Sequence, residues 1–382
     1  MKTPKKILVV TGEASGDMHG ANLVRAIRAR DGSIDVFGVG SKNMRNAGVT
    51  MLADAAEISV VGATEVFTHL GAIYRVYARL KRFLRNERPD LLILIDFPDF
   101  NILTGKAAKR LGIPVVYYIS PQVWAWRKGR AKTIAELVKT IMVLFPFEVD
   151  VYRRAGADVR FVGHPLADVV RSDLTQQQAR TALDLQQTGK IIALLPGSRR
   201  KELRHLLPDM LAAARQLLQR FPGVQFVLPV APTLSREFVE TFLSESGVAV
   251  RVIDGQVYDV LRASDAAIVT SGTATLETGL MSVPMVIVYR VSKLSYWIGR
   301  LIVRVQNIGL VNIVAGRRIV PELVQDEVTP ENISREIETV LRDPEQYEAI
   351  RNELLRVRTL LGEGGASGRA AAVIMEALGE TG

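Results

Sequence analysis

The chain has 382 residues and an apolar content of 48%, which is enough for sizeable hydrophobic cores and indicates two or three domains. It contains no cysteine, so disulfides and thiolate metal sites are excluded, and no apolar run reaches the roughly 18 residues of a membrane-spanning helix. The formal net charge of +9 favours an anionic partner: nucleic acid, a phosphate-bearing substrate or an anionic membrane face.

Strands alternate with helices from the start of the chain. Apolar runs predict strands over 5–10, 34–40, 91–95, 113–120 and 140–145. Apolar residues at helical spacing predict helices over 20–30, 66–85 and 102–111. This βαβ alternation is typical of a parallel sheet covered by helices on both faces.

The same rhythm restarts after a polar stretch over 168–190. Strands are predicted over 190–196, 224–230, 248–253, 265–270 and 285–289, and helices over 201–220, 233–246 and from 273 onward. The last fifty residues read as helices. We therefore expect an α/β protein with two Rossmann-like domains whose parallel sheets face each other across a cleft, where ligands of such sheets usually bind. The predicted parts are 1–167, 168–345 and a C-terminal helical part, 346–382, that packs back on the first domain.

Two glycine-rich turns follow predicted strands and are candidates for holding phosphate. In the first, VVTGEASGDMHGANL, Gly12, Ser15 and Gly16 allow a ligand close to the backbone, although a plain tight turn explains them as well. In the second, LLPGSRRKE, Gly197 ends a strand, Ser198 is expected to cap the next helix, and Arg199 lies at the positive end of that helix. This second turn suits a diphosphate, and the alternative is an ordinary helix cap with solvated arginines.

A third turn, SGTATLE, begins another helix with Ser271, Gly272 and Thr273. Glu277 follows one helical turn later and is placed to accept hydrogen bonds from a ribose, unless it is simply an exposed glutamate. The second and third turns together predict a nucleotide-diphosphate site in the second half of the chain. No Asp-x-Asp pair follows a strand there, and helix ends with arginine can neutralise a diphosphate, so we expect neither a metal nor a cofactor.

Two aspartates follow the buried strand in LLILIDFPDFN, and they have different expected roles. Asp99 is placed to cap the helix that follows. Asp96 ends the strand directly and should lie at the carboxyl edge of the sheet, where partial burial would raise its pKa. We therefore expect Asp96 to act as a general base toward a hydroxyl group. His19, Glu13 and Asp99 are the competing candidates for that role.

A basic amphipathic stretch spans residues 66–85. The candidate membrane contacts in it are Val66, Phe67, Leu70, Ile73, Arg75 and Arg79. A second such stretch covers 293–306. Each stretch is either a core-packed helix with a solvated face or a surface that docks on anionic lipid. Nucleic acid is disfavoured because no recognised binding module is present. The loop SPQVWAWR, with Trp124 and Arg127, either grips an anionic amphiphile or packs the domain.

Taken together, the motifs resemble the lipid-A-disaccharide synthase family, glycosyltransferases of GT-B architecture. The matching stretches span nearly the whole chain in order: GEASGD (12–17), IDFPDFN (95–101), SPQVWAWR (120–127), FPFE (145–148), VGHP (162–165), LLPGSR (194–199), SGTATLE (271–277) and NIVAGRRIVPELVQ (312–325). Two departures stand out, since relatives often carry a small residue at the position of Phe97 and the Met18-His19 pair varies.

The resemblance implies a reaction between two anionic lipids. UDP-2,3-diacylglucosamine would be joined to 2,3-diacylglucosamine 1-phosphate by inversion, giving a β-1,6 disaccharide and UDP. It also implies a cytoplasmic protein held peripherally on the cytoplasmic face of the inner membrane, at an anionic membrane surface, and it leaves a homodimer open.

The resemblance further implies roles for individual residues. Asp96 and Arg199 would be essential, with Arg199 on the UDP side. The UDP-binding set would be Gly197, Ser198, Arg199, Ser271, Gly272, Thr273, Glu277 and Asn312. The loops near the acceptor and donor sugars would contribute Gly12, Glu13, Ser15, Gly16, Asp17, Trp124 and Arg127.

Two other functions are compatible with parts of this pattern, and a third is disfavoured. Another GT-B enzyme, such as a UDP-N-acetylglucosamine epimerase or a muramyl-type transferase, would share the nucleotide half without lipid-facing helices. A membrane-attached module that binds nucleotide sugars would lack catalysis. A dinucleotide-dependent oxidoreductase is disfavoured, because the first glycine turn lacks the usual spacing.

Overall fold

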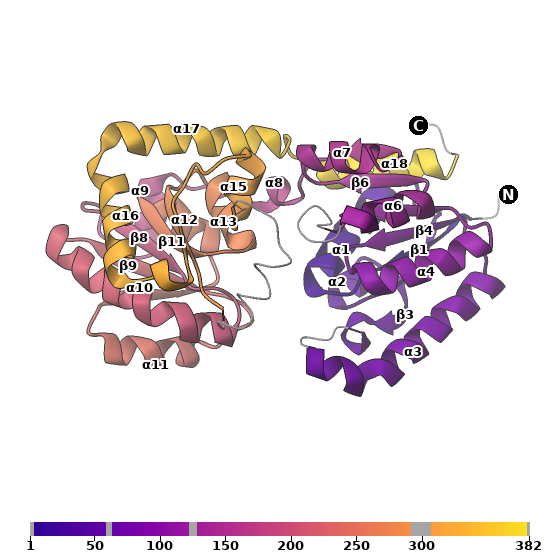
Figure 1. The fold of residues 1–382 in the computed structure, drawn as a ribbon, viewed down its shortest axis with the longest axis horizontal. Helices are drawn as coiled ribbons and strands as arrows, with labels where there is room; N and C mark the ends of the chain where they lie inside the picture. Colours follow the sequence, from indigo (N-terminus) through magenta and orange to yellow (C-terminus); the bar gives the residue numbers. More distant parts are fainter. Residues whose placement is uncertain (1–3, 59–62, 122–127, 292–306, 380–382) are drawn as a thin grey trace. The chain divides into compact units, whose positions relative to one another are not determined.

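The computed structural model describes residues 4–58, 63–121, 128–291 and 307–379 (Figure 1). The chain divides into two compact units, one made of residues 1–168 and 361–382, the other of residues 169–360. Each unit contains its own parallel β-sheet with helices on both faces. The predicted α/β class with two Rossmann-like halves is therefore confirmed.

The sheet of the first unit has seven strands in the order β3-β2-β1-β4-β5-β6-β7, and every neighbouring pair is parallel. The strands are β1 (Lys6–Val10), β2 (Asp35–Gly40), β3 (Thr50–Asp54), β4 (Leu91–Ile95), β5 (Val115–Tyr118), β6 (Thr140–Val143) and β7 (Val159–Phe161). The strand order reverses direction between β1 and β4. In open α/β sheets, ligands bind at the carboxyl ends of the strands beside such a reversal.

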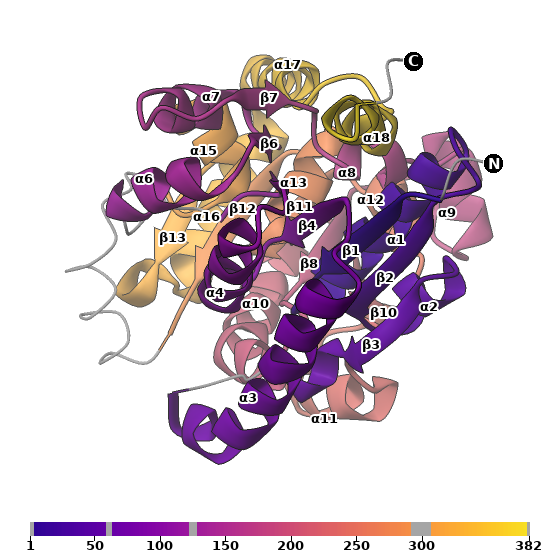
Figure 2. The same cartoon turned by 90° about the vertical axis from the view of Figure 1, so that its right-hand side faces the viewer.

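Helices cover both faces of this sheet (Figure 2). One face carries α3 (Ala63–Asn86), α4 (Pro98–Arg110), α6 (Lys128–Leu137) and α7 (Pro146–Arg153). The other carries α1 (Ala14–Arg28), the short α2 (Lys42–Asn46) and the C-terminal α18 (Ala366–Ala377). Alternate strand residues serve the two faces; Leu8, Leu92 and Ile141, for example, share a core with α3, α4 and α6. Burial on both faces explains why these strands read as continuous apolar runs.

The second unit repeats the architecture with six strands in the order β10-β9-β8-β11-β12-β13. The strands are β8 (Ile191–Leu195), β9 (Gln225–Val230), β10 (Val250–Asp254), β11 (Ala266–Thr270), β12 (Met285–Tyr289) and β13 (Glu322–Val324). The longer helices are α10 (Arg200–Arg220), α11 (Arg236–Ser246), α16 (Pro330–Arg342) and α17 (Pro344–Leu360). The shorter ones are α9 (Gln176–Ala182), α12 (Val257–Ala263), α13 (Thr273–Leu280) and α15 (Leu310–Ala315), and the short α8 (Leu166–Val169) lies where the chain passes from the first unit to the second. Helices α10, α11 and α16 share one core with the sheet.

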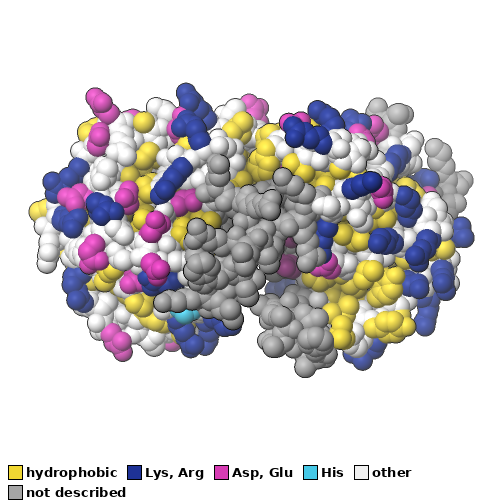
Figure 3. Space-filling model, viewed as in Figure 1, with side chains coloured by type: hydrophobic (Ala, Val, Ile, Leu, Met, Phe, Trp, Pro, Cys, Tyr) yellow, Lys and Arg dark blue, Asp and Glu magenta, His cyan; other side chains and the backbone are white. Residues whose placement is uncertain are grey.

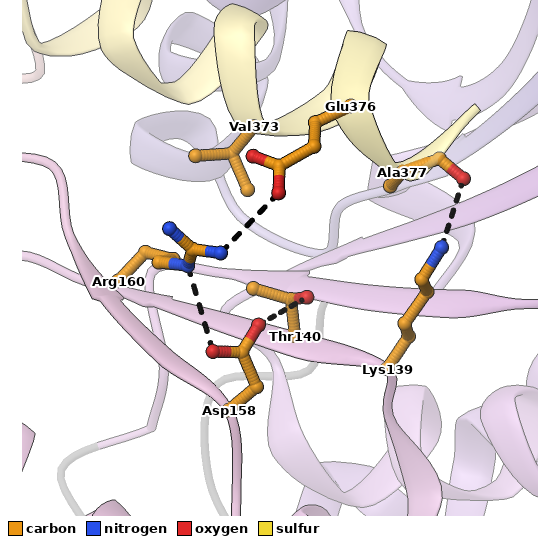
Figure 4. Close-up of a pocket in the computed structure, with 7 residues that line it drawn as sticks. All are labelled: Lys139, Thr140, Asp158, Arg160, Val373, Glu376 and Ala377. Atoms are coloured by element: carbon orange, nitrogen blue, oxygen red, sulfur yellow. Dashed lines mark hydrogen bonds and ion pairs between the residues drawn. The ribbon is translucent and has the colours of Figure 1, made fainter. Parts of the chain in front are cut away.

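The C-terminal segment returns to the first unit at residue 361, whereas the sequence suggested a third part from 346. Helix α17 belongs to the second unit, and α18 packs against α1 of the first. Polar contacts hold the end of α18 to the β6–β7 edge of the sheet: Arg160 pairs with both Glu376 and Asp158, and Lys139 donates to the carbonyl of Ala377 (Figure 4). They line a pocket of about 200 Å³.

Candidate active site

Strand β4 ends in a turn of unusual backbone conformation. Asp96 and Phe97 both have a φ of 47°, in the left-handed region that residues with a Cβ seldom adopt, and α4 begins immediately afterwards at Pro98. Each such residue costs about 1–2 kcal/mol. Strain of this kind persists only where the surrounding structure holds it, and it is concentrated at functional sites.

Neighbouring side chains hold this turn in place. The carbonyl oxygen of Asp96 accepts hydrogen bonds from the Tyr117 hydroxyl at 2.6 Å and from Nδ2 of Asn101 at 2.7 Å. The amide of Asn101 also donates to the carbonyl of Ile95, and the backbone N–H of Asp96 donates to the carbonyl of Ile119. Tyr117 and Asn101 are completely buried. The main chain of Asp96 is therefore fixed from β5 and α4 while its carboxylate remains free of these bonds.

The carboxylate of Asp96 has the electrostatics of a general base. Its pKa is raised from 3.8 to about 6: burial is the largest cause, the neighbouring Glu13 carboxylate adds to it, and the backbone N–H of Phe97 opposes the change. At neutral pH such a group is mostly ionised and still basic enough to accept a proton from a hydroxyl.

Asp99 has a different environment from the one predicted. We expected it to cap α4, but the capping position is Phe97, and Asp99 lies inside the first helical turn because the left-handed pair starts the helix earlier. Its side chain is 82% exposed and pairs with Arg130. Asp99 therefore offers an ordinary solvated carboxylate.

The loop after β1 packs directly on this turn. A Cβ at Gly12 would lie 2.1 Å from the ring of Phe97, so only glycine allows the two loops to meet this closely. Glu13 and Ser15 are exposed, and Gly16 is buried. The two strand-end motifs that the sequence placed far apart are thus brought together at one edge of the sheet.

Asp17 and His19, on α1, are directed into the first unit. The Asp17 carboxylate accepts three backbone hydrogen bonds, from Ser41, Asn43 and Met44, and so holds the start of α2. Burial lowers the pKa of His19 to about 4, and its Nδ1 has no hydrogen-bond partner in the described part of the chain. The Asp17 side chain therefore supports the scaffold of the loop. Trp124 and Arg127 lie outside the described residues.

The glycine turn after β8, predicted to hold a diphosphate, contains an internal carboxylate. Glu202 Oε2 accepts the backbone N–H groups of Ser198 (3.0 Å) and Arg199 (3.2 Å), and its Oε1 pairs with the Arg199 guanidinium at 3.1 Å. Gly197 has a φ of 112°, and a Cβ there would collide with the same glutamate. Arg199, not Ser198 as predicted, is the capping residue of α10, because Glu202 folds back over the turn. The donors expected for a diphosphate are all present, and Glu202 occupies them.

The turn before α13 is open by comparison. The helix has no side-chain cap at Gly272, and no described atom lies within 4 Å of a Cβ built there. The hydroxyl of Ser271 is used internally, since it donates to the carbonyl of Ile308. One turn into the helix, Oε1 of Glu277 accepts a hydrogen bond of 3.0 Å from the Tyr258 hydroxyl.

Asn312, the remaining residue of the expected UDP set, is completely buried in α15. Its Oδ1 accepts the backbone N–H groups of Ile319 and Val320, and its Nδ2 donates to the carbonyl of Val320 and to Glu322. Both ends of the amide are therefore engaged in shaping the 309–322 segment.

Helix α3 divides its apolar residues between the core and the surface. Val76, Leu80 and Leu84 are fully buried, while Leu70 and Tyr74 are 51% and 71% exposed. Ile73 is half-buried, and the side chains of residues 63–69, which include Val66 and Phe67, lie outside the described ones. Arg75 and Arg79 are exposed, and Arg79 donates to the carbonyl of Leu52. Figure 3 shows hydrophobic and basic side chains adjacent on this part of the surface. In the described ranges, no helix is long and apolar enough to span a bilayer.

A family profile described as "Lipid-A-disaccharide synthetase" matches residues 7–374. The chain belongs to this family. A lipid-A-disaccharide synthase from Geobacter metallireducens is 50% identical over 376 residues, covering 98% of each chain. The protein is therefore a glycosyltransferase of lipid A biosynthesis, and the resemblance stated from the motifs is confirmed.

Solved structures confirm the GT-B architecture. A UDP-N-acetylglucosamine 2-epimerase from Neisseria meningitidis, bound to UDP-GlcNAc, superposes with a TM-score of 0.67 at 15% identity, covering 97% of this chain and 100% of that one. The calicheamicin glycosyltransferase CalG4 gives a TM-score of 0.64 at 17% identity, with all of both chains covered. At these identities the likeness concerns the fold alone.

Four side chains at these turns were not singled out from the sequence: Tyr117, Asn101, Glu202 and Tyr258. Asn101 lies within the IDFPDFN motif, and Glu202 stands three residues after Arg199, the spacing of a capping box. The sequence near Asn101 and Glu202 could therefore have indicated that they contribute to these turns. Tyr117 and Tyr258 contact partners on other strands or helices, so no local pattern in the sequence indicated their roles.

Proposed function

We propose that the protein joins UDP-2,3-diacylglucosamine to 2,3-diacylglucosamine 1-phosphate with inversion, releasing UDP and a β-1,6-linked disaccharide 1-phosphate. The observation that carries the proposal is the Asp96 carboxylate, held on a strained turn with its pKa raised to about 6. Family membership supports the choice of lipid-linked sugars as substrates.

In this mechanism Asp96 takes the proton from the 6-hydroxyl of the acceptor as that oxygen attacks the anomeric carbon of the donor. The bond between the anomeric carbon and the UDP oxygen breaks in the same step, so the configuration inverts. The proton remains on Asp96 until it passes to solvent, and the electron pair leaves on UDP. One base suffices, because no covalent sugar–enzyme intermediate forms.

The second unit would bind the leaving group. Arg199 and the open N-terminus of α13 would stabilise the developing charge on the diphosphate, with the ribose on Glu277. The amides of Ser198 and Arg199 would join them once the diphosphate replaces Glu202 as their acceptor. The bound UDP-GlcNAc in the structurally similar epimerase supports placing a UDP-sugar on this fold.

The exposed part of α3 would contact the membrane. Leu70 and Tyr74 would enter the interface and Arg75 would meet anionic headgroups, so that the acyl chains of both substrates need not leave the bilayer completely. This arrangement would hold the protein peripherally on the cytoplasmic face of the inner membrane.

A reaction with synthetic donor and acceptor tests the proposal. We expect one UDP released per disaccharide formed, no UDP release when the acceptor is omitted, and a β-1,6 linkage by NMR. An α-linked product would contradict inversion, and UDP release without acceptor would instead indicate a hydrolase or an epimerase-type reaction.

A further inference from the structure

Tyr258 lies at the ligand-facing edge of the second sheet. Strand β10 ends at Asp254, and the next two residues, Gly255 (φ 65°) and Gln256 (φ 49°), both adopt the left-handed conformation. Helix α12 then begins at Val257, which puts Tyr258 in its first turn, at the carboxyl ends of the strands. Ligands of open parallel sheets bind at this edge.

The hydroxyl of Tyr258 donates to Oε1 of Glu277 at 3.0 Å. The two residues come from different helices, α12 and α13, which follow different strands. No other hydrogen bond or ion pair to this carboxylate occurs within the described ranges. One oxygen of Glu277 is thus fixed by a neutral donor, and Oε2 remains available, since a carboxylate accepts several hydrogen bonds.

The chemistry of the pair fixes the direction of this bond. Burial and the adjacent Glu277 carboxylate raise the pKa of the Tyr258 phenol well above its usual value, so it stays protonated and donates. Burial raises the pKa of Glu277, and the hydrogen bond from Tyr258 opposes that change. Tyr258 therefore favours the ionised form of Glu277 as well as its position.

We propose that Tyr258 is a positioning residue for nucleotide binding, fixing Glu277 so that its second oxygen accepts the ribose hydroxyls of a uridine nucleotide. The inference rests on the proposed function, in which Glu277 binds the ribose. A ligand without the hydroxyl that meets Glu277 gains nothing from this positioning, so the effect of Tyr258 is specific to the sugar.

The test compares UDP with 2′-deoxy-UDP and 3′-deoxy-UDP by calorimetry. A hydrogen bond to a charged group is worth about 1.5–3 kcal/mol, so the wild type should bind UDP roughly 10–100-fold more tightly than the analogue that lacks the contacted hydroxyl. In Tyr258→Phe we expect UDP to bind roughly 3–10-fold more weakly, while the binding of that analogue stays nearly unchanged. The preference for UDP over the analogue should shrink by the same factor.

Tyr347→Phe is the matched control. The Tyr347 hydroxyl donates to the carbonyl of Asp265 at 3.1 Å, just before β11 and hence at the opposite edge of the same sheet. The Tyr347→Phe variant therefore loses one tyrosine hydrogen bond of similar length in the same unit, away from Glu277. We expect its preference for UDP over the deoxy analogues to match the wild type.

The pH dependence of UDP binding gives a second readout that a purely structural role would not change. Without the Tyr258 hydroxyl the pKa of Glu277 rises, so the acid limb of UDP binding should move to higher pH in Tyr258→Phe and stay in place in Tyr347→Phe. Equal losses for UDP and the deoxy analogues with an unmoved acid limb would overturn the positioning role. If the wild type does not distinguish UDP from either analogue, the ribose role of Glu277 fails, and the inference fails with it.

Discussion

Replacing Asp96 by asparagine should slow the enzyme and stabilise its fold. The raised pKa means that the folded first unit binds a proton at Asp96 more tightly than the unfolded chain does. Between about pH 4 and pH 6 the unfolded chain ionises at Asp96 while the folded unit still holds the proton, so the fold loses stability as the pH rises through this range. The loss is complete above pH 6 and absent below about pH 4, where both states are protonated. Asparagine removes the charge and is tolerated in the left-handed conformation of this residue.

The size of the effect follows from the pKa. Moving it from 3.8 to about 6 corresponds to about 3 kcal/mol at pH 8, and partial exposure of the carboxylate reduces this to about 2 kcal/mol. For a unit of this size, about 2 kcal/mol raises the melting temperature by roughly 4–8 °C. We expect Asp96→Asn to show this gain at pH 8 and almost none at pH 4.

Turnover should change in the opposite direction. Loss of a positioned base lowers kcat by roughly 10²–10⁴-fold. Wild-type kcat/KM, followed by UDP release, should rise with pH through an apparent pKa of about 6, and the variant should lack that limb.

Asp99→Asn is the matched control, because Asp99 is solvated and lies three residues away. It should leave turnover and the pH dependence of stability nearly unchanged. The reasoning would be refuted if Asp96→Asn kept near-normal turnover while Asp99→Asn abolished it, or if the stability gain at Asp96 did not depend on pH.

Four further changes test other parts of the site. Arg199→Ala should weaken UDP binding by roughly 10-fold or more in calorimetry, since a charged hydrogen-bond donor to the diphosphate is lost. Glu202→Gln should tighten UDP binding by roughly 3–10-fold, because the diphosphate no longer competes with a carboxylate for the loop amides. Gly12→Ala should destabilise the first unit by about 1–3 kcal/mol in thermal unfolding, because its methyl group displaces the ring of Phe97. Leu70→Glu should reduce sedimentation with anionic vesicles by roughly 10-fold or more.

Each of these has a control or a contradicting outcome. Lys201→Ala removes an equal charge two residues after Arg199 and should leave UDP affinity nearly unchanged. Weaker UDP binding in Glu202→Gln would mean that Glu202 only orders the loop. Full stability of Gly12→Ala would contradict the tight loop contact. Leu355→Glu places the same charge at an equally exposed leucine of α17, so a similar loss of vesicle binding there would argue against α3 as the contact.

The sequence was most informative where side chains repeat with the period of a strand or helix. Strands such as β4 and β11 are buried on both faces, so their apolar runs identify them without further information. Strands β3, β7 and β13 were not predicted; β7 and β13 are only three residues long, and β3 has only three consecutive apolar residues, between Thr50 and Asp54. The strand-end position of Asp96 also followed from the sequence, because parallel strands place their carboxyl ends at one edge.

What only the tertiary structure decided is which polar groups pair. The sequence could propose Asp17, Asn312 and Glu277 as ligand contacts, but it could not show that Asp17 holds α2, that Asn312 holds its own loop, or that Tyr258 meets Glu277. Hydropathy patterns record whether a position is buried, which depends on its own strand or helix. Hydrogen-bond partners depend on how segments distant in the chain pack together, and no local pattern of the sequence contains that information.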